Sequence, residues 1–289
     1  MIYDTLIAPF AEDATMRHAL AACIALAFGG APIGVFLVLR RTALIGDALS
    51  HAILPGVAIA FVFAGFSLLW MTIGGVLAGL TVALLAGATA RLTPVKEDAS
   101  LAAFFTISLA TGTLLVSAFG TDEELLHVLF GKVRELQAPA VLAIAAIATG
   151  SMGVLALIYR PLIAECFDPG FLRSAGRAGA LVHAIFLSLV VLNLVGGFQA
   201  LGTLMAVGLM MLPAVTARFW AETAGGQIAV AVGLTIAAAV IGLLASFHAG
   251  TQPEASIVLV AGVFYLVSLA FGPRDSIAAR LIRLRHLEA

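Results

Sequence analysis

Apolar stretches, each about as long as a helix that crosses a lipid bilayer, follow one another along almost the entire chain. A transmembrane helix needs about 20 mostly apolar residues. Candidate spans cover residues 17–39, 44–63, 68–90, 99–119 and 138–159, then two spans within 180–217 with Gly196-Gly197 between them, and finally 228–247 and 255–272. The charged but partly apolar segment 120–137 is predicted to be a surface helix or a broken segment rather than a clean crossing. This pattern predicts an all-α, polytopic transmembrane bundle of about nine spans, with a range of eight to ten, formed by a single domain over residues 1–289.

The composition excludes water as the main solvent of the folded chain. Charged residues make up only 11% of the 289 residues, and the mean hydropathy is +1.13. Counting Gly and omitting Tyr, about 71% of the residues are apolar, against about 45–50% in soluble domains. The net charge of −1 offers no basic surface to nucleic acid. The two cysteines, Cys23 and Cys166, form neither a disulfide framework nor a CxxC motif.

The first twenty residues and the positive charges predict how the chain sits in the membrane. No basic n-region precedes the first span, so we expect no cleaved signal peptide. When Arg40 and Arg41 are placed in the cytoplasm and the spans alternate, twelve of the fifteen Lys and Arg residues lie on that side. Positive residues mark cytoplasmic loops. We therefore expect a cytoplasmic loop over 160–179 and a basic cytoplasmic tail, with the C-terminus, over 273–289.

The segment RRTALIGDALSHAILPG places two ionisable residues inside a predicted span. Asp47 and His51 are four residues apart, so on a helix they share one face. A charged group at a helix centre costs at least about 2.5–3.5 kcal/mol in a bilayer and usually has a function. A carboxylate and an imidazole one turn apart form half of a site for a divalent transition metal. Pro55, one turn later, predicts a kink or an unwound stretch of the kind that lines substrate sites.

Two structural interpretations compete with this metal site. In the first interpretation, Asp47 and His51 form a buried hydrogen bond that ties two helices together. In the second, Asp47 would be a helix N-cap near the membrane interface.

The other polar residues of the spans carry weaker signals. His183 is expected at the membrane interface, and Asn193 and Gln199 are expected to bridge helices. His248 and Glu254 lie in an outer loop and are candidates for helping a cation to enter.

Several motifs of enzymes are missing from the sequence. It contains no GxxxxGK[ST], so the chain does not bind ATP through a P-loop, and no HExxH, so it is not a zinc metalloprotease. An intramembrane aspartyl protease would need a second Asp inside the spans beside Asp47. These absences favour a transporter subunit over an enzyme.

At RRTALIGDALSHAILPGVAIAF the chain resembles the permease subunits of bacterial ABC importers for zinc, manganese and iron(II). Three further segments are similar to the same family: CFDPGFLRSAG (166–176), AVGLMMLPAVTARFWA (206–221) and QPEASIVLVAG (252–262), although Glu254 stands where a small residue is expected. The resemblance covers essentially the whole chain. It implies a type II ABC-importer-like permease in the bacterial inner (plasma) membrane.

The resemblance also implies partners and a shared metal site. It implies a homodimer of this chain, two copies of a separate cytoplasmic ABC ATPase that binds ATP, and a periplasmic or surface metal-binding protein. Each copy would give Asp47 and His51 to one transported ion. Ser50 would add a weak oxygen or orient His51, or would merely be a small packing residue. Two Asp and two His suit tetrahedral zinc, which we favour weakly, and suit manganese or iron(II) if waters complete the coordination. No permanently bound cofactor is expected.

The same resemblance assigns the ATPase contact to the loop 160–179. Asp168-Pro169-Gly170 is a strong turn signal. The apolar side chains around it would anchor in a groove of the partner, or would lie in the lipid headgroups as a membrane-surface helix. The residues expected to contact the ATPase are Phe167, Asp168, Pro169, Phe171, Leu172 and Arg173.

Two rival functions remain from the sequence. A proton-coupled secondary metal transporter would use the same Asp47 and His51 without an ATPase. A metal-independent channel or scaffold would use the pair only to join helices.

Overall fold

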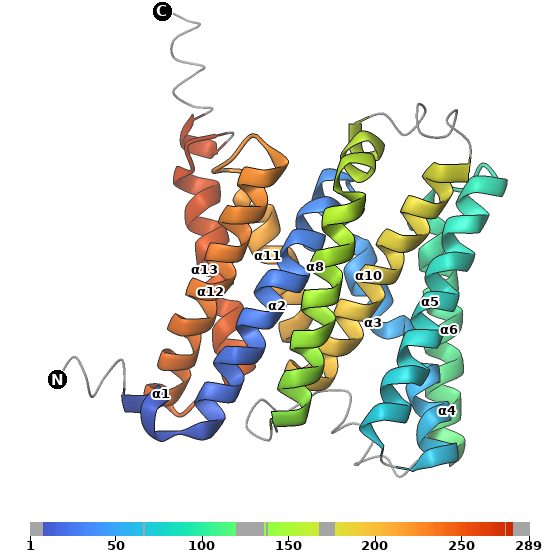
Figure 1. Cartoon of the computed structure of the whole chain (residues 1–289), viewed down its shortest axis with the longest axis horizontal. Helices are drawn as coiled ribbons and strands as arrows, with labels where there is room; N and C mark the ends of the chain where they lie inside the picture. The colour runs from blue at the N-terminus through green and yellow to red at the C-terminus, as the bar shows by residue number, and fades with distance from the viewer. Residues whose placement is uncertain are drawn as a thin grey trace, which may run out of the picture.

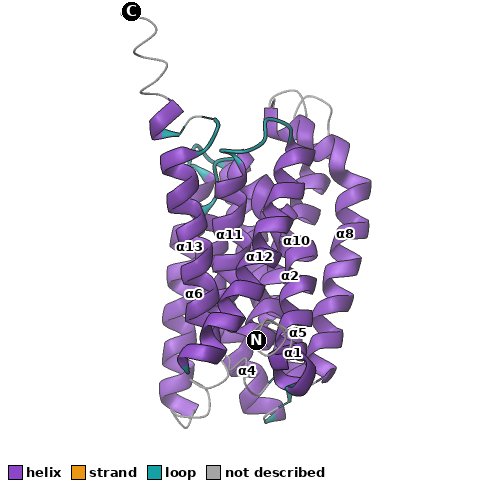
Figure 2. Cartoon of the chain, turned by 90° about the vertical axis from the view of Figure 1, so that its left-hand side faces the viewer, coloured by secondary structure: helices purple, strands orange, loops and turns teal. Residues whose placement is uncertain are grey.

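The structure is a computed structural model that describes residues 8–65, 67–119, 136, 138–167, 177–274 and 276–279. Within these ranges every longer regular element is an α-helix, and the helices lie side by side in one bundle (Figures 1 and 2). In chain order they are α1 (Ala8–Glu12), α2 (Ala14–Leu39), α3 (Leu44–Ala52), α4 (Leu54–Ala64), α5 (Leu68–Leu92), α6 (Glu97–Phe119), α8 (Ala138–Phe167), α10 (Arg177–Leu201), α11 (Thr203–Ala217), α12 (Ala224–Ala249) and α13 (Pro253–Phe271).

The number of apolar helices confirms a polytopic membrane bundle. Eight spans in the described ranges are long and apolar enough to cross a membrane, with α3 and α4 together forming one of them. The shorter apolar helix α11 has 15 residues and follows α10 directly. Eight long spans plus α11 agree with the predicted number of about nine.

Helix α2 forms the centre of the bundle. It packs against α8, α10, α11 and α12, and most of its second half is buried. The ring of Phe36 makes edge-on contacts with Tyr159 of α8 and Phe186 of α10, with ring centroids 5.8 and 6.3 Å apart. A helix in lipid is normally apolar towards both lipid and neighbour, so close packing rather than an apolar stripe holds this core together.

Small residues allow several helix pairs to approach at backbone distance. A side chain on Gly34 of α2 would overlap the backbone of Met210 in α11, and Gly56 of α4 and Gly74 of α5 lie against each other's backbones in the same way. Such contacts between small residues are the usual means by which helices associate in lipid.

One predicted boundary between spans is wrong. The pair Gly196-Gly197 does not separate two spans, because α10 runs through it to Leu201. The two glycines instead accommodate Ile147 of α8 and Ala206 of α11. The break comes at Gly202, whose φ of +84° lies in the left-handed region that favours glycine.

The predicted polar loop 160–179 is also shorter than expected. Helix α8 continues through Pro161 to Phe167, and α10 begins at Arg177. The extension is helical because its apolar residues have a core to reach, and Leu162 is fully buried. Residues 168–176 lie outside the described part, as does the predicted surface helix or broken segment over 120–137, apart from Leu136.

Candidate metal site

Helix α3 ends in the middle of the second span, just after the predicted site residues. Ile53 separates α3 from α4, and Pro55 occupies the first turn of α4, where its missing N–H costs no helical hydrogen bond. Figure 1 places α3 at mid-height in the bundle and α4 towards the end away from the C-terminus. The predicted interruption near Pro55 is therefore confirmed.

Helix α3 has one buried face and one open face. Ile45, Leu49 and Ser50 are buried against the bundle. Asp47 and His51 lie on the exposed side of the same helix, one turn apart. The structure thus places the two predicted ligands together on a face that the described part of this chain leaves uncovered.

Neither structural alternative for the pair fits this geometry. The N-cap of α3 is Ala43, so Asp47 lies inside the first turn and is not the cap. Both side chains are exposed rather than buried, and no described residue forms a hydrogen bond or ion pair with either of them. Within the described part of the chain, the two residues therefore form no bond that ties helices together.

The described residues of one copy supply too few ligands for a metal ion. The described residues contain no group of three or more His, Cys, Asp or Glu side chains that could hold one. Tetrahedral and octahedral sites need four to six ligands. The Asp47 and His51 side chains can therefore be only part of such a site.

Two serine hydroxyls stabilise the backbone around the pair. Ser50 donates a hydrogen bond of 2.5 Å to the backbone oxygen of Asp47. Ser108 of α6, which is buried, donates one of 2.8 Å to the backbone oxygen of Ala52, at the end of α3. Hydroxyl groups from neighbouring helices commonly satisfy backbone groups at such interruptions in membrane helices. Ser108 could not be predicted from the sequence, because a serine in an apolar span does not reveal which residue it will bond.

The amides of α10 bridge helices, as predicted. Asn193 donates to Ser151 of α8 over 2.7 Å, and Gln199 accepts from Thr72 of α5 over 2.6 Å. His183 was expected at the membrane interface, and it lies near the start of α10, but the contacts of its side chain were not predicted. Its side chain is buried and lies beside Arg40 and Glu165.

The candidate residues for outer access lie away from α3, on other helices. His248 is exposed near the end of α12 and bonds the backbone oxygen of Leu244, and Glu254 lies in the first turn of α13. A role for them in cation access stays a prediction.

Of the residues expected to contact the ATPase, only one lies in the described part. Phe167 ends α8 with 80% of its surface exposed. The other five residues, Asp168, Pro169, Phe171, Leu172 and Arg173, lie outside it.

Comparisons with known proteins agree with this architecture. Residues 12–272 match the ABC 3 transport family. The manganese transport system membrane protein MntC of Halalkalibacterium halodurans is 31% identical over 269 residues, which cover 93% of this chain and 91% of that protein. The chelated iron transport system membrane protein YfeD of Yersinia pestis is 30% identical over 271 residues, which cover 94% of this chain and 90% of that protein.

A solved structure extends the likeness to the fold. It is PsaBC from Streptococcus pneumoniae in complex with Fab, and it superposes with a TM-score of 0.82 at 26% sequence identity. The superposition covers 99% of this chain and all of that chain. By the family match and by its bundle of membrane helices, the chain belongs to the ABC 3 transport family and is a membrane permease subunit of a metal-importing ABC transporter.

Proposed function

We propose that Asp47 and His51 from two copies of this chain surround one divalent metal ion on its path through the membrane. The observation that carries this proposal is the open face of α3, where both ligands are exposed within a membrane span. A carboxylate facing lipid would be strongly unfavourable. A second copy related by a two-fold axis would cover that face and bring the ligand number to four.

We favour manganese or iron(II) as the transported ion over zinc. The relatives compared above are named for manganese and for chelated iron. Two carboxylates and two imidazoles, with water in the remaining positions, make a mixed O/N site that suits these ions. The site has no cysteine among its candidates, so it lacks the thiolates that bind zinc tightly.

The energy would come from an ATPase on separate chains. The sequence has no P-loop of its own. The segment between α8 and α10, starting at the exposed Phe167, is the surface that we assign to the ATPase. A binding protein on the outer side would deliver the ion, and the C-terminus would lie in the cytoplasm.

Uptake of ⁵⁴Mn²⁺, iron(II) or zinc into vesicles that hold the permease with its ATPase and binding protein tests this function. We expect ATP-dependent uptake of manganese or iron(II) that falls at least about tenfold in Asp47→Asn and in His51→Ala. Replacing a residue that only supports a metal ligand typically lowers metal affinity or activity by about 10–100-fold. Removing a ligand carboxylate or imidazole itself should lower them at least as much. Asp98→Asn, an exposed carboxylate at the start of α6, is the matched control and should transport normally.

Two results would contradict the proposal. Normal uptake by both site variants would return the pair to a structural role. Uptake that survives ATP depletion and stops when the proton gradient collapses would identify the proton-coupled secondary transporter instead.

A further inference from the structure

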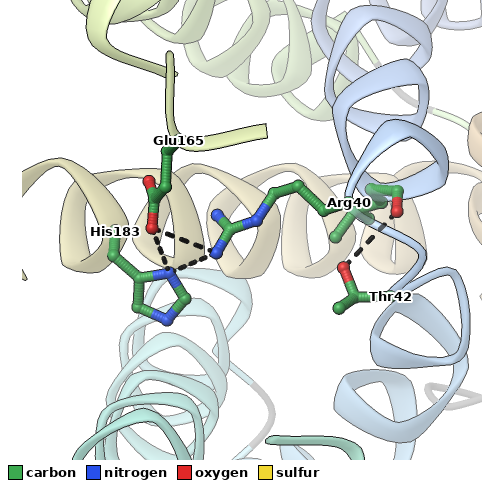
Figure 3. Close-up of polar contacts among 5 residues, drawn as sticks. Arg40, Thr42, Glu165 and His183 are labelled. Carbon is green, nitrogen blue, oxygen red and sulfur yellow. Dashed lines mark hydrogen bonds and ion pairs between the residues drawn. The ribbon is translucent and has the colours of Figure 1, made fainter. Parts of the chain in front are cut away.

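Three ionisable side chains that the metal site does not use meet at one end of the bundle (Figure 3). Arg40 follows the last residue of α2, Glu165 lies in the last turn of α8, and His183 lies near the start of α10. Nη2 of Arg40 is 3.2 Å from Oε1 of Glu165, and Nδ1 of His183 lies 2.5 Å from Nη2 and 3.2 Å from Oε1. The guanidinium also stacks over the Phe186 ring, 5.2 Å from its centroid.

This charge cluster, Arg40–Glu165–His183, is buried. The three side chains are only 10%, 9% and 7% exposed. Placing charges out of water is unfavourable unless they are paired and fully hydrogen-bonded, and apolar residues of similar volume often stabilise a fold as well or better. Burial of three ionisable groups therefore calls for a reason other than stability.

The pairing within the cluster is incomplete. Nη1 of Arg40 and Oε2 of Glu165 are buried and have no hydrogen-bond partner among the described residues. These two atoms belong to the same guanidinium and carboxylate that already share one contact. A guanidinium and a carboxylate can pair through two parallel contacts, which is the geometry that the Arg fork favours. The Arg40–Glu165 pair therefore makes only one of the two contacts open to it.

The cluster joins the two parts of the molecule that transport must connect. Glu165 and His183 lie on the two helix ends that flank residues 168–176, the segment that we assign to the ATPase. Arg40 begins the turn from α2 into α3, and Asp47 follows seven residues later. Any displacement of the α8 and α10 ends therefore acts directly on the helix end that leads into α3.

The turn between Arg40 and α3 is tight enough to pass on such a displacement. Thr42 donates both its backbone N–H and its hydroxyl to the backbone oxygen of Leu37, over 3.0 and 3.4 Å (Figure 3 shows the hydroxyl bond). Arg41 has a φ of +60°, in the left-handed region that non-glycine residues seldom adopt. The turn is thus fixed to the last turns of α2 by two hydrogen bonds to one carbonyl oxygen.

We propose that Arg40, Glu165 and His183 are positioning residues that link the ATPase-facing helix ends to the metal site on α3. The proposal rests on the function proposed above. According to this proposal, movement of α8 and α10 changes how the Arg40 side chain is shared between Glu165 and His183. The resulting displacement of Arg40 then moves the start of α3.

Coupling between ATP hydrolysis and transport is the property to measure. Proteoliposomes that contain the permease with its ATPase would be assayed for Mn²⁺ ions moved per ATP hydrolysed. We expect Glu165→Gln and Arg40→Lys to keep ATP hydrolysis but to lower this ratio at least fivefold. Mn²⁺ binding to the detergent-purified permease should stay unchanged. Glu222→Gln is the matched control, because it breaks an exposed ion pair with Arg274 of 2.9 Å and should leave the ratio unchanged.

A variant with an apolar cluster separates positioning from simple packing. The triple variant Arg40→Met, Glu165→Leu, His183→Leu removes all three ionisable groups together, so it leaves no unpaired charge buried and should fold. We expect it to melt at or above the wild-type temperature and still to be uncoupled. Wild-type coupling in the triple variant, or unchanged coupling in both Glu165→Gln and Arg40→Lys, would overturn the proposal. Failure of the metal site itself would appear separately, as normal uptake by Asp47→Asn.

Discussion

At the scale of single residues, the interruption between α3 and α4 depends on one hydroxyl group from another helix. Ser108 satisfies the backbone oxygen of Ala52 where α3 ends, and this bond fixes α6 to the end of the helix that carries Asp47 and His51. The buried hydroxyl is therefore part of the support of the candidate metal site, although it touches neither ligand.

Replacing that hydroxyl should lower stability and weaken the site. Ser108→Ala removes a buried hydrogen bond, which is worth about 1 kcal/mol. We expect the purified permease to melt a few degrees lower and to bind Mn²⁺ less tightly. Thr106→Ala is the control, because this exposed hydroxyl bonds only the oxygen of Ala102 in its own helix. Equal melting temperatures and Mn²⁺ affinities for the two variants would show that Ser108 supports nothing beyond its own helix.

The candidate ligands could be singled out from the sequence, but the residues that support them could not. The spacing of Asp47 and His51 inside an apolar span is visible without a structure, and so is Pro55. The partners of Ser108 and of His183 depend on which helices become neighbours, and the periodicity of uniformly apolar spans does not encode that. This is why the contacts of His183 were not predicted and Glu165 was not singled out.

At the scale of helices, close contacts between backbones decide the packing. Gly34 of α2 lies against the backbone of Met210, which cannot move without moving α11. The spans and their approximate ends were predictable from apolar length. The roles of the glycines were not, because a glycine that allows close packing and one that ends a helix look alike in sequence, as Gly197 and Gly202 show.

A methyl group at the contact of α2 and α11 should destabilise the bundle. Gly34→Ala would force two backbones apart, and overpacking of this kind costs about 1–3 kcal/mol. Gly153→Ala on α8 is the control, because nothing lies within 4 Å of its added methyl group. Thermal unfolding of the detergent-solubilised chain, followed by intrinsic fluorescence, should show a lower melting temperature for Gly34→Ala alone. A Gly34→Ala protein that melts like wild type would mean that α2 and α11 do not pack this closely.

At the scale of the whole molecule, the open face of α3 is the surface on which we propose that a second copy of the chain binds. One copy offers two ligands within a span, and two such faces opposed across a two-fold axis would make a complete and water-accessible site. The sequence pointed to this assembly only through its resemblance to a family of importers. The structure adds that the ligand face is uncovered.

Cross-linking in membranes checks that arrangement. The test uses a Cys166→Ser background, in which the other native cysteine, Cys23, is fully buried. The substitution Ala48→Cys then adds one thiol on α3, between Asp47 and His51 in the sequence. We expect a short bifunctional maleimide to join two copies through this position. Leu157→Cys on α8, where the native side chain is 83% exposed, should react with the reagent without forming dimers. Dimers through position 157 but not through 48 would place the interface elsewhere.

The most direct test of the shared site is the stoichiometry of metal binding. The number of Mn²⁺ ions bound per chain would be measured by mass spectrometry and by calorimetric titration. The measurement would be made on the purified wild-type permease and on the Asp47→Asn and His51→Ala variants. We expect one ion for every two chains in the wild type and a loss of at least about tenfold in affinity in each variant. One ion per chain, or binding that is unchanged in both variants, would contradict a site that two copies share.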